Sequence, residues 1–209
     1  MKSFILTTAF IVAASATVSA KTNTTKVLAN GYPYTQVPFT SVNLAHNSFW
    51  GARLQAAREV TVPLAFSKCE SEHRYKNFDM AAYTLKHPGH PGLKTPEWDV
   101  AKIMGLSFDD TDVYKTIEGA SYILQTYPDK KLKAYIDSVL NIVAAAQEPD
   151  GYLYTARTIN PEHPHGWSGK KRWEKEEDLS HELYNLGHMV DAACAHYQAT
   201  GSHKFLDIA

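Results

Sequence analysis

The sequence predicts an all-α protein, and three observations support that prediction. Apolar residues recur at three- and four-residue steps through residues 112–143 and 180–200, which is the spacing of one face of an amphipathic helix. Strand-like alternation is confined to Val42-Asn43-Leu44. One four-residue pattern occurs twice after a tight break in the chain: a cap residue, two polar residues and an apolar anchor. The two copies are Asp129-Lys130-Lys131-Leu132 and Ser202-His203-Lys204-Phe205. Helix, turn, helix and long loop therefore recur, as in helical hairpins packed side by side.

Residues 1–20 have the three parts of a secretory signal peptide. Lys2 gives a positive start, Phe4–Ala14 is a short apolar run, and Val18-Ser19-Ala20 is a small-residue cleavage site. The run is too short to span a bilayer, which takes about 20 apolar residues. We expect an exported protein, periplasmic or extracellular, whose polar residues 21–36 form a flexible lead-in to a folded part at 37–209.

The first half of the folded part predicts extended backbone followed by short helices. A short extended N-terminal segment should end in a strand at residues 42–44. Ser48-Phe49-Trp50 should then precede a helix whose apolar pattern runs from Arg53 to Phe66, and Pro63 should kink or end that helix. A further helix is expected at about residues 78–83. The turn-rich residues 87–92 and a short helix from Pro96 to Met104, which Gly105 ends, should follow.

The second half predicts three long helices. Asp112 should open the first, Pro128-Asp129 should end it and cap the second, and Ser180 should open the third, which Gly201 ends. Pro149-Asp150-Gly151 predicts a turn, Tyr152–Thr155 is expected to be extended, and a long irregular loop should follow. Ser202 with Phe205, Leu206 and Ala209 predicts the start of another helix, so we expect the N-terminal part of a longer, truncated domain.

Composition excludes some classes of partner. The 209 residues carry a formal net charge of -1, and 44% of them are hydrophobic, so the chain can form a core and has no basic excess for nucleic acid or an anionic membrane. Cys69 and Cys194 have no nearby partner for a metal site. We expect free buried thiols in preference to a disulfide bridge.

Two histidines at the start of the third long helix are candidates for a site. His181 and His188 are seven residues apart, about 10.5 Å along a helix, which is too far to ligate one metal ion easily. A histidine near a helix N-terminus favours its neutral form and suits hydrogen bonding to hydroxyl groups. The alternative is a buried or capping histidine.

The loop before that helix is dense in histidine, tryptophan, lysine and arginine. Three interpretations compete: a solvated loop, a metal site built on His163 and His165, or a carbohydrate surface in which Trp167 and Trp173 stack on sugar rings. One helix start carries three acidic residues, Asp109, Asp110 and Asp112. Acidic residues cap helix N-termini and are favoured in the first turn, so capping alone explains why they occur there.

Four motifs occur together and in order. They are Asp110-Thr111-Asp112-Val113-Tyr114-Lys115, Gln147-Glu148-Pro149-Asp150-Gly151-Tyr152-Leu153, Ser180-His181-Glu182-Leu183-Tyr184-Asn185-Leu186-Gly187-His188 and Tyr197-Gln198-Ala199-Thr200-Gly201. With Phe49-Trp50 and Asn77-Phe78, this set resembles the β-L-arabinofuranosidases of glycoside hydrolase families 127 and 146, over about residues 37–209. The long loop at Pro161-Glu162-His163-Pro164-His165 looks more like the second of these families.

The resemblance implies an (α/α)6 toroid, of which this chain would form the N-terminal part of the catalytic domain. It implies release of β-L-arabinofuranose, with retention, from arabinose-containing plant glycans. The nucleophile would be a cysteine held on zinc and the acid/base a glutamate. We expect those residues and the zinc ligands beyond Ala209, so this chain would carry no catalytic or metal-binding residue and would be inactive alone.

The resemblance also implies four substrate-binding positions. His181 matches a sugar-binding histidine, and Asn77, Asp112 and Asp150 match motif positions near the site. Cys69 and Cys194 match neither the nucleophile nor a zinc ligand. Two alternatives stay open: a non-catalytic carbohydrate-binding module, and a polysaccharide lyase on a similar toroid.

Overall fold

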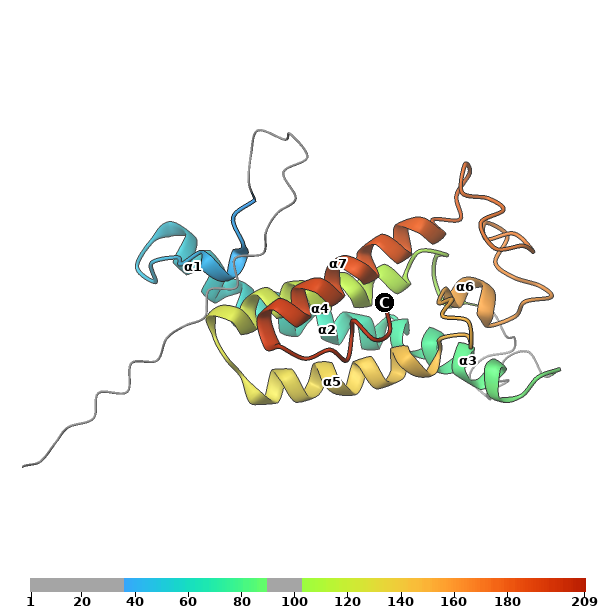
Figure 1. Ribbon diagram of the computed structural model, residues 1–209, viewed down its shortest axis with the longest axis horizontal. Helices are drawn as coiled ribbons and strands as arrows, with labels where there is room; N and C mark the ends of the chain where they lie inside the picture. Colours follow the sequence, from blue (N-terminus) through green and yellow to red (C-terminus); the bar gives the residue numbers. More distant parts are fainter. Residues whose placement is uncertain (1–35, 90–102) are drawn as a thin grey trace, which may run out of the picture. The chain divides into compact units, whose positions relative to one another are not determined.

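The computed structural model of the protein describes residues 36–89 and 103–209, and residues 37–209 form one unit (Figure 1). All regular structure in the described ranges is helical. The predicted signal peptide, most of the lead-in and the predicted helix from Pro96 lie outside these ranges. The all-α prediction is confirmed.

The predicted strand at residues 42–44 is wrong. The short 3-10 helix η1 (Phe39–Ser41) precedes it, and Val42 has extended backbone angles, φ -99° and ψ 123°. Val42 and Leu44 are exposed. No strand in the described residues lies beside this segment to accept its backbone hydrogen bonds, so an extended conformation forms without a sheet.

Pro63 interrupts the first helical stretch, as predicted. Ser48 caps helix α1 (Phe49–Ala56), since its side chain accepts a hydrogen bond from the backbone N–H of Gly51 at 3.0 Å. The stretch then widens into the π-helical turn η2 (Ala57–Thr61) before α2 (Val62–Ser71) begins. Proline has no N–H for the preceding turn and its ring crowds that turn, so a π-helical segment just before Pro63 accommodates it.

Three long helices build the centre of the fold. Helix α4 (Asp110–Thr126) turns at Tyr127–Asp129 into α5 (Lys130–Ala145), and α7 (Glu182–Thr200) packs along α4 (Figure 1). Asp129 caps α5 as predicted, since its Oδ1 accepts from the N–H groups of Lys131 and Leu132 at 2.8 and 3.1 Å. Helix α3 (Arg74–Lys86) is longer than predicted and lies against α5 and α6 (Thr155–Thr158).

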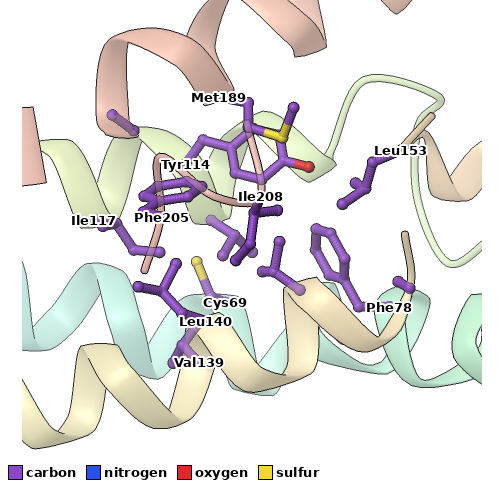
Figure 2. Packing of buried hydrophobic residues seen from close by; sticks show 14 of the residues in the cluster. Cys69, Phe78, Tyr114, Ile117, Val139, Leu140, Leu153, Met189, Phe205 and Ile208 are labelled. Carbon is purple, nitrogen blue, oxygen red and sulfur yellow. The ribbon is translucent and has the colours of Figure 1, made fainter. Parts of the chain in front are cut away.

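The core lies between these helices. Its fully buried side chains come from every long helix and from the segment after α7, as Figure 2 shows; they include Phe78, Tyr114, Ile117, Leu140, Met189 and Phe205. Residues 203–209 form hydrogen-bonded turns, with Ala209 N–H donating to the Phe205 carbonyl at 3.0 Å. The predicted anchor Phe205 is therefore buried, although the structure shows turns there and no regular helix.

Both cysteines are free, as predicted, but only Cys69 is buried. Cys194 is exposed, so its predicted burial is wrong. It lies on the side of α7 that also exposes Leu183, Val190 and Tyr197, away from the buried face that packs on α4. Helical spacing alone does not say which of two apolar faces a neighbouring helix covers.

Candidate functional site

The loop between α6 and α7, residues 159–181, is here called the rim loop. It has no regular helix, and its own side chains hold it. Glu174 Oε2 accepts from the backbone N–H groups of Lys170 and Lys171 at 2.8 and 3.0 Å, and Lys175 Nζ donates to the Gly166 carbonyl at 2.7 Å. These hydrogen bonds within the rim loop hold its residues 166–175 in an ordered conformation before α7 begins.

Glu176 caps α7 from within the rim loop. Its Oε1 accepts from the backbone N–H of Glu182 at 2.6 Å and its Oε2 from that of Leu183 at 3.2 Å. Ser180 donates its hydroxyl to the same carboxylate. The helix therefore begins at Glu182, two residues later than the predicted start at Ser180, because the cap comes from a side chain six residues upstream.

His181 precedes this helix in the left-handed conformation, at φ 58°. Its Nδ1 lies 2.7 Å from the Leu179 carbonyl oxygen. A carbonyl can only accept, so Nδ1 carries the hydrogen, and in the neutral ring the lone pair is on Nε2. Nε2 has no hydrogen bond within the described part of the chain. The geometry thus presents an acceptor for a hydroxyl group.

Aromatic rings surround His181. Its ring centroid lies 4.8 Å from that of Phe108 and 5.7 Å from that of Tyr184. Trp167 stacks on Phe108 at 6.5 Å, and His165 meets Trp167 edge to face at 5.3 Å. The rim loop, the residue Phe108 before α4 and the first turn of α7 therefore form an aromatic cluster around one hydrogen-bond acceptor, a combination found in small-molecule sites.

His188 is separated from His181 by the ring of Tyr184. The His188 and Tyr184 rings meet edge to face at 4.5 Å, and Lys115 contacts the Tyr184 hydroxyl and ring. Burial first, and then the Lys115 charge, lowers the pKa of His188. Nowhere in the described residues do three His, Cys, Asp or Glu side chains come together as metal ligands. The ring of Tyr184 thus contacts both imidazoles, His181 on one side and His188 on the other.

Asp150 sits in an ion-pair network. Arg172 donates to Asp150 and to Glu148, each at 2.5 Å, and its guanidinium lies 4.1 Å from the ring centroid of Tyr152. The hydrogen bonds from Arg172 lower the pKa of Asp150. Asp150 also accepts from the Tyr152 N–H at 3.3 Å. The Asp150 carboxylate ties the rim loop to the turn after α5.

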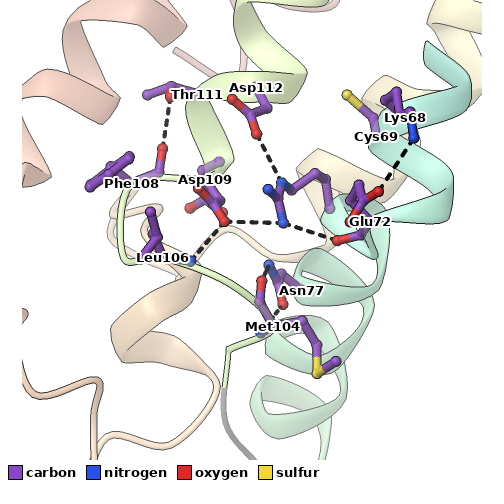
Figure 3. A network of polar contacts seen from close by, with 12 residues as sticks. Lys68, Cys69, Glu72, Asn77, Met104, Leu106, Phe108, Asp109, Thr111 and Asp112 are labelled. Carbon is purple, nitrogen blue, oxygen red and sulfur yellow. Dashed lines mark hydrogen bonds and ion pairs between the residues drawn. The ribbon is translucent and has the colours of Figure 1, made fainter. Parts of the chain in front are cut away.

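Asn77 and Asp112 lie in a second network, drawn in Figure 3. Asn77 is fully buried, and its amide exchanges hydrogen bonds of 3.0 and 2.8 Å with the backbone of Met104. Arg74 pairs with Asp112 at 2.8 Å and with Asp109 at 3.0 Å. These two predicted substrate-binding residues therefore brace the chain entering α4, and they do not meet His181 in one cluster of contacts.

Asp110 joins α4 to the segment after the Gly151 turn. Its two carboxylate oxygens accept from the backbone N–H of Thr155 at 2.8 Å and from its hydroxyl at 2.6 Å. The side chain is 1% exposed, and burial raises its pKa to about 7. Helix α4 thus starts at Asp110, two residues before the predicted Asp112.

Sequence reasoning missed the residues that fix this site. Glu176 carries no local capping pattern, since it lies six residues before the helix that it caps. Glu182 is 2% exposed, and its Oε2 accepts from the Tyr152 hydroxyl and the Trp173 N–H, each at 2.9 Å. Its place beside His181 in the third motif was the only signal.

Comparison with known proteins gives concordant matches. The family model described as β-L-arabinofuranosidase, GH127 catalytic domain, matches residues 41–209. A non-reducing end β-L-arabinofuranosidase of Bifidobacterium longum subsp. longum is 40% identical over 105 residues, which are 50% of this chain and 15% of that protein.

None of the described helices is long and apolar enough to cross a membrane.

Two solved structures share the fold. A GH127 β-arabinofuranosidase superposes with a TM-score of 0.73 at 65% identity, over 85% of this chain and 26% of that one. A GH127 β-L-arabinofuranosidase from Geobacillus stearothermophilus T6 gives 0.65 at 33% identity, over 80% and 24%. The described helices thus form part of an (α/α) toroid, and the chain spans about a quarter of these structures.

Proposed function

Because the chain belongs to the GH127 β-L-arabinofuranosidase catalytic-domain family, we propose that it forms one wall of the sugar site of an exported β-L-arabinofuranosidase. The relatives that it matches are described as β-L-arabinofuranosidase or β-arabinofuranosidase. The substrate would be an arabinose-containing plant glycan. Residues 1–20 would direct export, and N-terminal sequencing of the secreted protein should then begin near Lys21.

The orientation of His181 is the observation that carries the proposal. The Leu179 carbonyl fixes the hydrogen on Nδ1, so Nε2 can accept from a hydroxyl of the arabinofuranosyl ring. Phe108 and Tyr184 flank the imidazole, so an apolar ring face can pack there while one hydroxyl is bound. A hydrogen bond of this kind would orient the sugar.

The catalytic groups implied by the family are proposed to lie outside this chain. Burial raises the pKa of the Cys69 thiol, which lies 3.7 Å from the Thr116 hydroxyl, and Cys194 is exposed on α7. Neither cysteine is placed as a thiolate ligand, and the described residues hold no set of metal ligands. The described residues therefore offer no set of groups that fits the zinc ion implied by the family.

A hybrid enzyme tests the proposal. Residues 41–209 would replace the matching segment of the 65% identical relative, whose remaining chain is retained. We expect the hybrid to hydrolyse a β-L-arabinofuranoside, and His181→Ala within it to lower kcat/KM at least about tenfold, the loss of one hydrogen bond to substrate. His163→Ala, an exposed histidine of the same loop, is the matched control. A correctly folded hybrid without hydrolysis would refute the proposal.

The two other functions predict different results. A non-catalytic carbohydrate-binding module would bind oligosaccharide, and the hybrid would hydrolyse nothing. A lyase would act on uronic acids and release unsaturated products that absorb in the ultraviolet. Analysis of the products that the hybrid forms therefore distinguishes the glycoside hydrolase, the carbohydrate-binding module and the lyase.

A further inference from the structure

A cavity of about 240 Å3 lies beside the first turns of α7. Its lining comes from the turn after α5, the rim loop and one face of α7. The lining residues include Asp150, Tyr152, Arg172, Trp173, Glu182 and Leu186. His181 is not among the lining residues, since its ring turns to Phe108 and Tyr184. The first residues of α7 therefore contribute His181 to the aromatic cluster and Glu182 to the cavity.

Glu182 gives this cavity an unmet hydrogen-bonding capacity. The side chain is 2% exposed, and its Oε2 already accepts from the Tyr152 hydroxyl and the Trp173 N–H. Its Oε1 is buried and has no hydrogen-bond partner among the residues that the structure describes. A buried polar atom without a partner is costly, and natural proteins rarely leave one without a reason. A hydroxyl donor bound in the cavity would supply the missing hydrogen bond.

The walls are suited to a sugar ring. Trp173 and Tyr152 meet edge to face at 5.6 Å, and Trp173 remains 45% exposed. The Trp173 backbone is held in the left-handed region at φ 64°, where its N–H reaches Glu182. An indole fixed at the mouth of a cavity offers a flat apolar face for stacking, and the carboxylate behind it offers an acceptor.

The charges favour a neutral ligand. Arg172 is neutralised by its ion pairs with Glu148 and Asp150, and Glu182 adds a further carboxylate. The lining therefore has no spare cation for a uronic acid. The volume lies below the roughly 300–1,000 Å3 of pockets for drug-sized ligands, which suits a single sugar unit.

We propose that this cavity binds one neutral sugar unit of the glycan next to the unit held at His181. The identity of the glycan rests on the proposed function, whereas the cavity and its acceptor do not. The first turn of α7 would then set the angle between two adjacent sugar units, with His181 on one side and Glu182 on the other.

Binding measurements on the protein test this. The probes are methyl β-L-arabinofuranoside and a β-linked arabinobiose, titrated by ligand-observed NMR. Glu182→Gln is matched to the question: its amide oxygen can still accept from Tyr152 and Trp173, while an N–H donor replaces the unpartnered Oε1. We expect it to weaken disaccharide binding about tenfold, the value of one hydrogen bond, and to leave the monosaccharide unchanged.

A second variant guards against misfolding. Trp173→Ala removes the stacking face but keeps the backbone N–H to Glu182, and it should weaken the disaccharide in the same way. Glu162→Gln, an exposed glutamate of the same loop, should change neither affinity. If Glu182→Gln and Trp173→Ala both bind the disaccharide as tightly as the wild type does, the cavity proposal is overturned. The proposed sugar contact of His181 would not be affected by that result. Binding of neither sugar by the wild-type protein would overturn this proposal, while the hybrid's hydrolysis tests the proposed function separately.

Discussion

Replacing Asp110 by asparagine should change how the stability of the protein depends on pH. The Asp110 carboxyl is buried, accepts two hydrogen bonds from Thr155, and has a pKa raised by burial from 3.8 to about 7. Between these two pH values the folded protein keeps a proton on Asp110 that the unfolded chain has released. The free energy of unfolding therefore falls as pH rises through this window.

The size of the effect follows from the pKa difference. Each pKa unit corresponds to about 1.4 kcal/mol, so Asp110 should cost the native state about 4 kcal/mol between pH 4 and pH 7. An asparagine can keep both contacts, because its carbonyl accepts from the Thr155 N–H while its amide donates to the Thr155 hydroxyl oxygen. Asp110→Asn should lack this loss of stability.

Urea unfolding followed by circular dichroism, at half-unit steps from pH 4 to pH 7.5, measures the difference. The free energy of wild type minus that of Asp110→Asn should decline by about 4 kcal/mol across the window. Asp178→Asn, at an exposed position of the rim loop, controls for the loss of one carboxylate. Parallel curves for wild type and Asp110→Asn, within about 1 kcal/mol, would refute the burial argument.

Three further predictions concern positions that hold the site or the core. Glu176→Ala should lower the free energy of unfolding by about 1–2 kcal/mol, because α7 loses its cap, whereas Glu176→Gln should keep most of it; thermal unfolding compares the two. His196 is buried with neither ring nitrogen hydrogen-bonded, and burial lowers its pKa below 6.5. Wild type should therefore lose stability as pH falls below about 6.5, and His196→Leu should not, as unfolding at pH 7 and pH 5 would show. Arg172→Gln should free the rim loop from Glu148 and Asp150, and amide hydrogen exchange at Trp173 should accelerate at least about tenfold; unchanged exchange would contradict the anchoring role.

The helices were the predictable part of this fold. Helices α4, α5 and α7 follow from apolar spacing, because a long amphipathic stripe needs only its own sequence to be recognised. Their starts were less predictable. Helix α7 begins two residues late because Glu176 supplies the cap from within the rim loop. The strand expected at residues 42–44 fails for a similar reason, since a strand needs a partner that the sequence does not identify.

The position of His181 in the fold was predictable, whereas the contacts of the other candidate residues were not. The position of His181 at the start of α7 followed from the motif, and its role in sugar binding stays a prediction. The partners of Asn77, Asp112 and Asp150 lie 27, 38 and 22 residues away along the chain, so no local pattern could reveal them. These hydrogen bonds and ion pairs show that Asn77, Asp112 and Asp150 each connect two segments of the chain, whether or not they also bind a ligand.

The carboxylates near the site have positioning roles that their residue type conceals. Asp110 accepts from the Thr155 N–H, Glu176 from the first N–H groups of α7, and Glu182 from the Trp173 N–H. Each acid binds a backbone amide of another segment: Asp110 fixes the start of α4 to the start of α6, and Glu176 and Glu182 fix the start of α7 to the rim loop. A sugar hydroxyl is recognised by one hydrogen bond of about 1 kcal/mol, which is selective only if its acceptor cannot move. In the proposed site, the contacts of Glu176 and Glu182 would hold the start of α7 in place, so that His181, with one ring nitrogen already bound to Leu179, would present its other nitrogen in a fixed direction.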